Sequence, residues 1–226
     1  KDKQKYSDIL VSELHELGYN LEYKIVTMSE YGVPQNRKRL VLLAFRLGQI
    51  ALINPLYNQD NYPTVRDAIG NLPPIDAGEQ NEIDPLHRAC RLSEINLRRI
   101  RSSVPGGTWR DWDESLQLPC HKRKSGRTYP SVYGRMCWDE PSPTITTQFY
   151  GYGNGRFGHP EQDRALSLRE GAILQSFPPD YIFTDEEHPS NRRDLGIHIG
   201  NAVPVELGRA IGISILNHLQ EVGANG

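Results

Sequence analysis

The sequence predicts an α/β fold that continues into a smaller, irregular β-rich region. Near the N-terminus, a helical repeat is followed by two apolar runs that resemble strands. Helix, strand, loop and strand in this order are typical of an α/β sheet. The central part is rich in Gly, Pro, Trp, Tyr and Thr with little helical periodicity, and helical patterns then return. We therefore expect three segments: 1–62 and 164–226 in the α/β part, and 63–163 in the irregular part.

The first elements follow from apolar spacing and stop signals. A helix is expected over residues 6–17, because apolar residues recur there at helical spacing and Gly18 supplies a stop. Residues 21–28 and 40–45 have the composition of strands. The second strand, LVLLAF, is apolar on both faces, which predicts a place inside a sheet. A polar loop with three cations in the run QNRKR directly precedes this strand.

The later helices are predicted by their end signals. A short helix in TVRDAIGNLPP is expected to end at Gly70 and the prolines after it. The stretch LSEINLRRIRSS predicts a helix with Ser93 as its N-cap. Ser167 and Glu170 stand three residues apart before an apolar run, which is the capping-box pattern. The last helix is expected to begin with Pro204 in its first turn.

Composition indicates a globular protein of a reducing compartment. The 226 residues are 37% hydrophobic and 24% charged, and no stretch approaches the roughly 20 apolar residues of a membrane helix. The N-terminus lacks the pattern of a secretory signal, so we expect a cytoplasmic protein without membrane contact. The three cysteines, Cys90, Cys120 and Cys137, are far apart and form no C-x-x-C pair. This argues against a disulfide framework and against a metal site.

One segment of the chain is strongly basic. Residues 98–127 carry a local charge of +5 within a chain of net charge −2. Its basic residues are Arg98, Arg99, Arg101, Arg110, Lys122, Arg123, Lys124 and Arg127. A local basic patch on an acidic protein can bind phosphate groups, and it can equally be a solvated loop. Charge alone leaves both interpretations open.

Four motifs, each ordinary by itself, occur in a definite order. They are YGVPQNRKRL at 31–40, PSPTITTQFYGYGNGRFGHP at 141–160, RALSLREGAILQSFPPDY at 164–181 and IGNAVP at 199–204. Singly they could be charges beside a strand, a mobile hairpin tip, helix-surface residues and a turn. Together, in this order and spacing, they resemble the C-terminal half of DNA cytosine-5 methyltransferases, with a Rossmann-like methyltransferase sheet and a target-recognition domain.

The first motif resembles the family's eighth motif, Gln-x-Arg-x-Arg. The resemblance implies that Arg39 reaches the flipped cytosine near its O2 and stabilises the negative charge that develops there. Arginine suits this role better than lysine, because its planar group stays charged and can contact oxygens in pairs. Arg37 and Gln35 complete the expected catalytic set, and they would hold the loop or contact phosphate or neighbouring carboxylates.

The region between the eighth and ninth motifs is where this family keeps its target-recognition domain, here 63–163. The resemblance implies that double-stranded DNA is the partner and that the target base is flipped, because C5 and C6 cannot be attacked inside the stack. Thr144 would contact a phosphate near the flipped nucleotide, and the glycine-rich run would offer base-edge contacts. The expected DNA-binding residues are Thr144, Ile145, Tyr150, Tyr152, Asn154, Arg156, Lys122, Arg123 and Lys124.

The last motif resembles the family's tenth, which folds back to the cofactor domain. The resemblance implies that Asn201, Ala202 and Val203 line a pocket for S-adenosylmethionine. The family often has Ser where this chain has Ala202, so one hydroxyl contact is expected to be missing.

The family's nucleophile is a cysteine in a Pro-Cys motif of the N-terminal half. This chain has one such pair, Pro119-Cys120, but it lies in the recognition region and continues as HKRKSG, so we interpret Cys120 as non-catalytic. The glycine-rich cofactor loop, the acidic ribose contact and the Glu-Asn-Val segment are also missing from the sequence. We therefore expect an N-terminal catalytic half as partner, in cis or as a separate subunit.

Several alternatives remain open at this point. The chain could be a truncated form or proteolytic fragment of a full enzyme, the small subunit of a naturally split methyltransferase, or a non-catalytic relative that binds DNA. A sequence-specific DNA-binding module without an enzymatic parent is the alternative from another class. It predicts tight DNA binding that needs neither cofactor nor partner.

Overall fold

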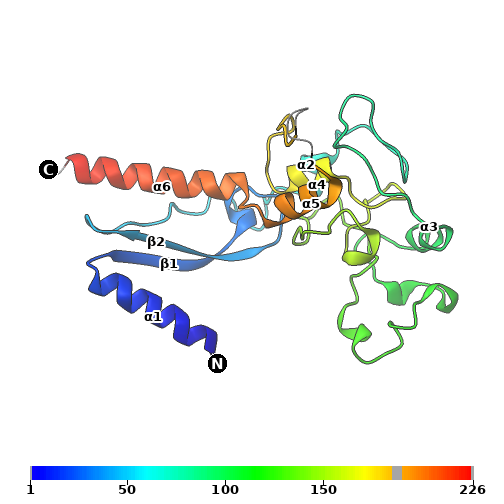
Figure 1. Cartoon of the computed structure of the whole chain (residues 1–226), viewed down its shortest axis with the longest axis horizontal. Coiled ribbons are helices and arrows are strands. Elements are labelled where there is room, and N and C mark those ends of the chain that lie inside the picture. The colour runs from blue at the N-terminus through cyan, green and yellow to red at the C-terminus, as the bar shows by residue number, and fades with distance from the viewer. Residues whose placement is uncertain (1, 185–189, 225–226) are drawn as a thin grey trace.

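The computed structural model describes residues 2–184 and 190–224, and the chain in it is elongated (Figure 1). A two-stranded hairpin and the long C-terminal helix lie at one end, three short helices lie in the middle, and the irregular chain lies at the other end. The described α-helices are α1 (Asp2–Glu16), α2 (Val65–Ile69), α3 (Glu94–Arg101), α4 (Leu168–Leu174), α5 (Arg192–Asn201) and α6 (Val205–Ala224). The strands are β1 (Asn20–Thr27) and β2 (Lys38–Phe45). The 3-10 turns are η1 (Met28–Tyr31), η2 (Trp109–Asp111), η3 (Glu114–Leu116), η4 (Gly126–Thr128) and η5 (Tyr152–Asn154).

The hairpin packs one of its faces on α6. β1 and β2 are antiparallel, and alternate residues of each strand point to the same face. On one face Val26, Val41 and Leu43 are buried in a core that also contains Leu207 and Ala210 of α6. Burying a side chain of this size contributes roughly 1.5–3 kcal/mol, so this face fixes α6 against the sheet.

The opposite face of the hairpin is open. Tyr23, Ile25 and Leu40 are exposed by 53%, 71% and 57%, and in Figure 1 α1 lies on this side of the hairpin without covering them. The prediction that strand 40–45 lies inside a sheet is therefore wrong for this structure. The strand is apolar on both faces, but in the described part of the chain it has one strand neighbour and one covered face.

The central segment 63–163 is irregular, as the sequence predicts, but it is not β-rich. All of it is described, and it contains isolated bridges and short turns rather than strands. Side chains take over part of the backbone hydrogen bonding that strands would provide. Buried Arg135, for example, donates to the carbonyl oxygens of Ile100, Ser103 and His159.

The predicted helix signals at two positions are confirmed. Gly18, two residues beyond the end of α1, has a φ of +82°, a conformation that residues with a side chain rarely adopt. At α4, the Ser167 hydroxyl accepts from the Glu170 N–H at 3.1 Å, and the Glu170 carboxylate accepts from the Ser167 N–H at 2.7 Å. This capping box orients α4, which lies within the third of the four sequence motifs, at 164–181.

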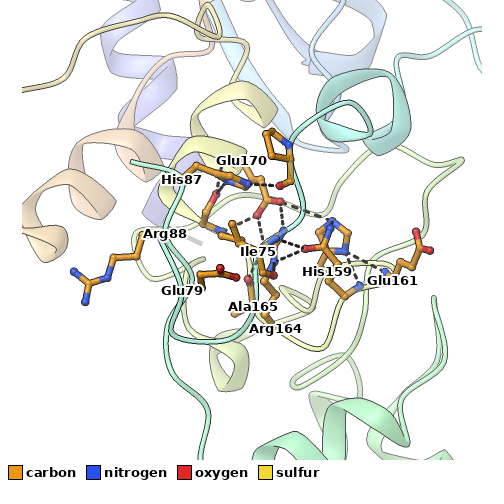
Figure 2. Close-up of polar contacts among 12 residues, drawn as sticks. Ile75, Glu79, His87, Arg88, His159, Glu161, Arg164, Ala165 and Glu170 are labelled. Carbon is orange, nitrogen blue, oxygen red and sulfur yellow. Dashed lines mark hydrogen bonds and ion pairs between the residues drawn. The ribbon is translucent and has the colours of Figure 1, made fainter. Parts of the chain in front are cut away.

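A buried ion pair anchors the start of α4 (Figure 2). Arg164 donates two hydrogen bonds, of 2.8 and 2.7 Å, to the two carboxylate oxygens of Glu170. His159 Nε2 lies 3.8 Å from the same carboxylate, and His87 bonds to the Ser167 hydroxyl. The idea that this motif lies on a helix surface is wrong, since Glu170 is completely buried.

Helix α5 was not predicted from the sequence. Asn191 caps it by accepting from the Asp194 N–H at 3.0 Å, and Leu195 and Ile199 are buried in the main core. By length and composition alone, the helical stretch Arg192–Gly223 is apolar enough to cross a membrane. The helices of a protein core pass the same test, and here both α5 and α6 contribute residues to a core.

Candidate functional site

A cavity of about 320 Å³ lies where the start of β2 meets the turn between α5 and α6. Its size is at the lower end of the range for small-molecule sites. Its lining residues are Met28, Arg37, Arg39, Leu40, Val41, Leu42, Asn201, Ala202, Val203, Pro204, Leu207 and Ile211. The structure thus brings the two arginines expected in catalysis next to the three residues expected at the cofactor, although they are far apart in sequence.

The two arginines differ in how they are held. Arg39 is exposed, and its Nη1 donates at 2.8 Å to the Lys38 carbonyl. Arg37 is half-buried, and its Nη1 lies 3.4 Å from the carbonyl oxygens of both Ile145 and Gly200. Burial, and secondly the charge of Arg39, lower the pKa of Arg37. Neither guanidinium forms an ion pair with any residue that the structure describes, so both can receive an oxygen-rich ligand.

The Nε atom of Arg37 adds an observation of its own. It is buried and has no hydrogen-bond partner in the described part of the chain. A buried donor without a partner is costly, roughly 1–3 kcal/mol, and a ligand acceptor in the cavity would remove that cost. The lining therefore combines an apolar wall from β2 with unpaired donors.

Gln35, the third residue of the expected catalytic set, does not line the cavity. It is completely buried, and its Oε1 accepts from the Ile145 N–H at 3.1 Å. Gln35 and Arg37 together bind both backbone polar groups of Ile145. Of the roles expected for these two residues, this geometry favours holding the loop, and their part in catalysis stays a prediction.

Two of the residues expected to bind DNA face the protein interior. Ile145 is completely buried in the main core. Tyr152 is 3% exposed, its hydroxyl lies 3.1 Å from the Ser103 hydroxyl, and burial raises its pKa to about 12. We therefore correct the expectation for both: their side chains are buried in the protein and are not available to contact DNA.

Arg156 is also held by the protein. Its Nη1 donates to the Gly107 carbonyl at 2.8 Å and lies 3.4 Å from that of Arg135. A guanidinium bound to two carbonyl oxygens has fewer donors left for a base edge, so the expected reading of a base by Arg156 finds no support in this geometry.

The other expected contacts keep accessible side chains. Asn154 is exposed, and Thr144 and Tyr150 are partly exposed. Arg192 of α5 lies over the Tyr150 ring at 5.1 Å. Among the three basic residues, all exposed, Lys122 bonds Glu114 at 2.7 Å. These positions remain candidates for contact with DNA.

Cys120 lies in the same basic stretch. Its side chain is exposed, and it is not among the residues that line the cavity.

Sequence reasoning missed Gln175, which bonds to Gln35 inside the core. The one signal for it was a polar amide within the otherwise apolar run AILQSF. Such a residue is buried only if its amide finds partners, and these come from distant segments.

Comparison with known proteins gives many relatives, including the following three. The chain is 54% identical over 210 residues to the type II methylase M.HgiDII of Herpetosiphon aurantiacus, a match that covers 93% of the chain and 59% of the relative. It is 33% identical to the type II methyltransferase M1.HphI of Haemophilus parahaemolyticus, over 92% of the chain and 50% of the relative. It is 30% identical to DNA (cytosine-5)-methyltransferase 3 of Arabidopsis thaliana, over 90% of the chain and 18% of the relative. The chain thus spans about half the length of M.HgiDII and M1.HphI.

The fold has a counterpart among solved structures. A protein described as a DNA modification methyltransferase, encoded within a prophage of Escherichia coli, superposes with a TM-score of 0.65 at 21% identity. The superposition covers 96% of this chain and 66% of that protein. A family model for C-5 cytosine-specific DNA methylases matches residues 1–217, and the chain therefore belongs to that family.

Proposed function

We propose that this chain is the C-terminal part of a DNA cytosine-5 methyltransferase, which transfers a methyl group from S-adenosylmethionine to C5 of a flipped cytosine in a specific DNA site. The observation that carries the proposal is the cavity at the start of β2, which both Arg39 and Asn201 line. In this proposal the chain supplies DNA recognition, through segment 63–163, and a charge-stabilising arginine. Segments 1–62 and 164–226 belong to the catalytic α/β domain.

The chemistry explains why an arginine is needed here. C5 of cytosine becomes a good nucleophile only after covalent attack on C6, and negative charge then develops on the ring and at O2. Arg39 donates only to a neighbouring carbonyl and extends from the first residues of β2. A guanidinium at this position can stabilise that charge.

The nucleophile is proposed to come from another part of the enzyme. Cys120 is exposed in the recognition segment and does not line the cavity. The open apolar face of the hairpin, formed by Tyr23, Ile25 and Leu40, is the surface on which we expect an N-terminal catalytic half to pack. Since the 54% identical relative is a type II methylase, we place the enzyme in the cytoplasm.

The residues of the cavity fit part of S-adenosylmethionine, which when bound supplies the methyl group. The unpaired Arg37 Nε offers a donor, and the apolar side chains of Val41 and Leu207, on the α6 side of the hairpin, offer a surface for a ring. Asn201, which is exposed and also lines the cavity, offers an amide. Most of the cofactor site is proposed to lie in the N-terminal half.

Replacing Asn201 with Ala in the complete enzyme is expected to weaken cofactor binding more than DNA binding. The loss of one amide contact is typically worth about 0.5–1.5 kcal/mol, which is about a 2- to 13-fold change in the dissociation constant. Calorimetry with S-adenosylmethionine measures it directly. Asn154→Ala, an exposed asparagine of the recognition segment, is the matched control and should leave cofactor affinity unchanged. Normal cofactor affinity in Asn201→Ala would remove the residue from the pocket.

Replacing Lys122, Arg123 and Lys124 together with Ala is expected to flatten the salt dependence of DNA binding. Each lost phosphate contact lowers the log–log slope by about one unit. The contribution of Lys122 should be the smallest, because it is already paired with Glu114. Fluorescence anisotropy between low and physiological salt measures the slope, with Arg209→Ala on α6 as control. An unchanged slope in the triple variant would mean that the stretch is merely solvated.

Transfer of a tritiated methyl group from S-adenosylmethionine to DNA tests the proposed function. We expect no transfer by the 226-residue chain alone and transfer when it is mixed with the N-terminal half, in wild type and in Cys120→Ser alike. Activity of the chain alone that vanished in Cys120→Ser would overturn the proposal and make Cys120 the nucleophile. Tight DNA binding by a mixture that never transfers methyl groups would favour the non-catalytic DNA-binding module instead.

A further inference from the structure

A network of hydrogen bonds between buried amide groups connects separate parts of the fold, and Gln175 lies at its centre. Gln175 directly follows α4 and is completely buried. Its Oε1 accepts a hydrogen bond from Gln35 Nε2 at 2.9 Å, and its Nε2 donates to the Ile199 carbonyl at 2.8 Å. Both ends of the amide are thus occupied by partners of the right kind, which fixes the orientation of the side chain.

Gln35 and Arg37, both in the loop that precedes β2, extend this hydrogen-bond network to the central segment 63–163. Gln35 accepts from the Ile145 N–H at 3.1 Å, while Arg37 lies 3.4 Å from the carbonyl oxygens of Ile145 and Gly200. Every backbone polar group of Ile145 is therefore bound by a side chain of the loop that leads to Arg39. Gln175 holds that loop from the other side, through Gln35.

Close packing seats the recognition segment on α4 and α5. A Cβ atom at Gly171 would lie 2.0 Å from the Phe149 ring, and one at Gly200 would lie 2.5 Å from the backbone of Thr146. Real Cβ atoms essentially never approach so closely, so segment 146–150 touches the helix backbones directly. There is no gap at these positions, so a shift of segment 146–150 would also displace α4 or α5.

We infer that Gln175 is a positioning residue that couples the seating of the recognition segment to the placement of Arg39. Arg39 lies two residues beyond Arg37, so a displacement of the held loop moves the start of β2. Removal of the Gln175 amide leaves Gln35 Nε2 and the Ile199 carbonyl without this buried partner, and such groups rearrange to find others. The inference rests on the proposed function, because the placement of Arg39 matters only if Arg39 acts on the flipped cytosine.

The test is the kinetics of Gln175→Met in the complete enzyme. Methionine keeps the length and flexibility of the side chain and removes its polar atoms. We expect kcat for methyl transfer to fall by about 10- to 100-fold, the size of effect that a small misplacement of a catalytic group produces. Dissociation constants for DNA and S-adenosylmethionine should stay within about twofold, since the residues that contact them are unchanged. The double variant Gln35→Met/Gln175→Met should lose no more than the worse single variant, because both belong to one network.

Ile173→Val, in the helix α4 that Gln175 follows, is the control for a purely structural effect, because Ile173 is buried in the core and its side chain has no polar link to the loop. Melting temperature and kcat are measured for both variants. If Gln175→Met loses more kcat than Ile173→Val at an equal fall in melting temperature, the positioning role is supported. An unchanged kcat, or a loss equal to that of the control, overturns it. A wild-type enzyme that methylates no cytosine would refute the proposed function, and the positioning role with it, whereas the other outcomes leave the proposed function intact.

Discussion

Turnover of the complete methyltransferase is expected to fall by about 10²–10³-fold when Arg39 is replaced with Ala, the effect of losing one preorganised charge-stabilising donor. The contacts of Arg39 indicate no large structural role. It is exposed, bonds only its neighbour's carbonyl, and forms no ion pair in the described part of the chain. Its loss should therefore cost chemistry rather than folding. Single-turnover methyl transfer, with the melting temperature measured alongside, separates the two.

Lys38→Ala is the matched control for Arg39. Lys38 is the neighbouring exposed cation on the same strand, and it does not line the cavity. Turnover in this variant should stay near that of the wild type. Near-normal turnover combined with poor folding in Arg39→Ala would instead make Arg39 a structural residue.

The second large effect is expected on stability. Glu170→Gln should lower the free energy of unfolding by about 3–5 kcal/mol, because it removes one partner of a buried ion pair and leaves the other charge uncompensated. Arg164 is 1% exposed and directs two hydrogen bonds to the carboxylate. Urea denaturation measures the change. Asp139→Asn in the exposed pair with Arg66 is the control, and it should hardly alter stability.

The same cluster predicts a loss of stability in acid. Burial raises the pKa of Glu170, but the hydrogen bonds and charge of Arg164 outweigh it, and the net pKa lies below the ordinary value. The stability that this pair contributes is present above the pKa of an unfolded glutamate and is lost as pH falls through the lower, folded value. For His159, burial lowers the pKa to about 4. As pH falls below about 6.5, the histidine of the unfolded chain therefore takes up a proton before the histidine of the folded chain does, and stability falls. A wild-type stability that did not fall between pH 6.5 and 4 would contradict this account.

Local signals in the sequence were sufficient for much of the fold. The stop at Gly18 and the capping box at Ser167 are short-range features, and both occur as predicted. Helix α5 escaped prediction because its glycines lower its helix propensity. It forms because Leu195 and Ile199 reach the core, which is a tertiary effect.

The candidate site was predictable only through the resemblance to a family. No spacing rule connects Arg39 with Asn201, since the chain between them folds into other segments before they meet at the cavity. The burial of Tyr152 was missed for a similar reason: its partner, Ser103, lies in a separate part of the central segment. Sequence shows which side chains are available, but long-range packing decides which of them face a ligand.

Nucleoside mass spectrometry of DNA from cells that express the complete protein tests the central claim most directly. The account predicts 5-methyl-2′-deoxycytidine above the background of cells without the protein, and its loss when Arg39 is replaced with Ala. Methylation on an exocyclic nitrogen of cytosine or adenine, or no methylated nucleoside at all, would contradict the claim that this chain serves a cytosine-5 methyltransferase.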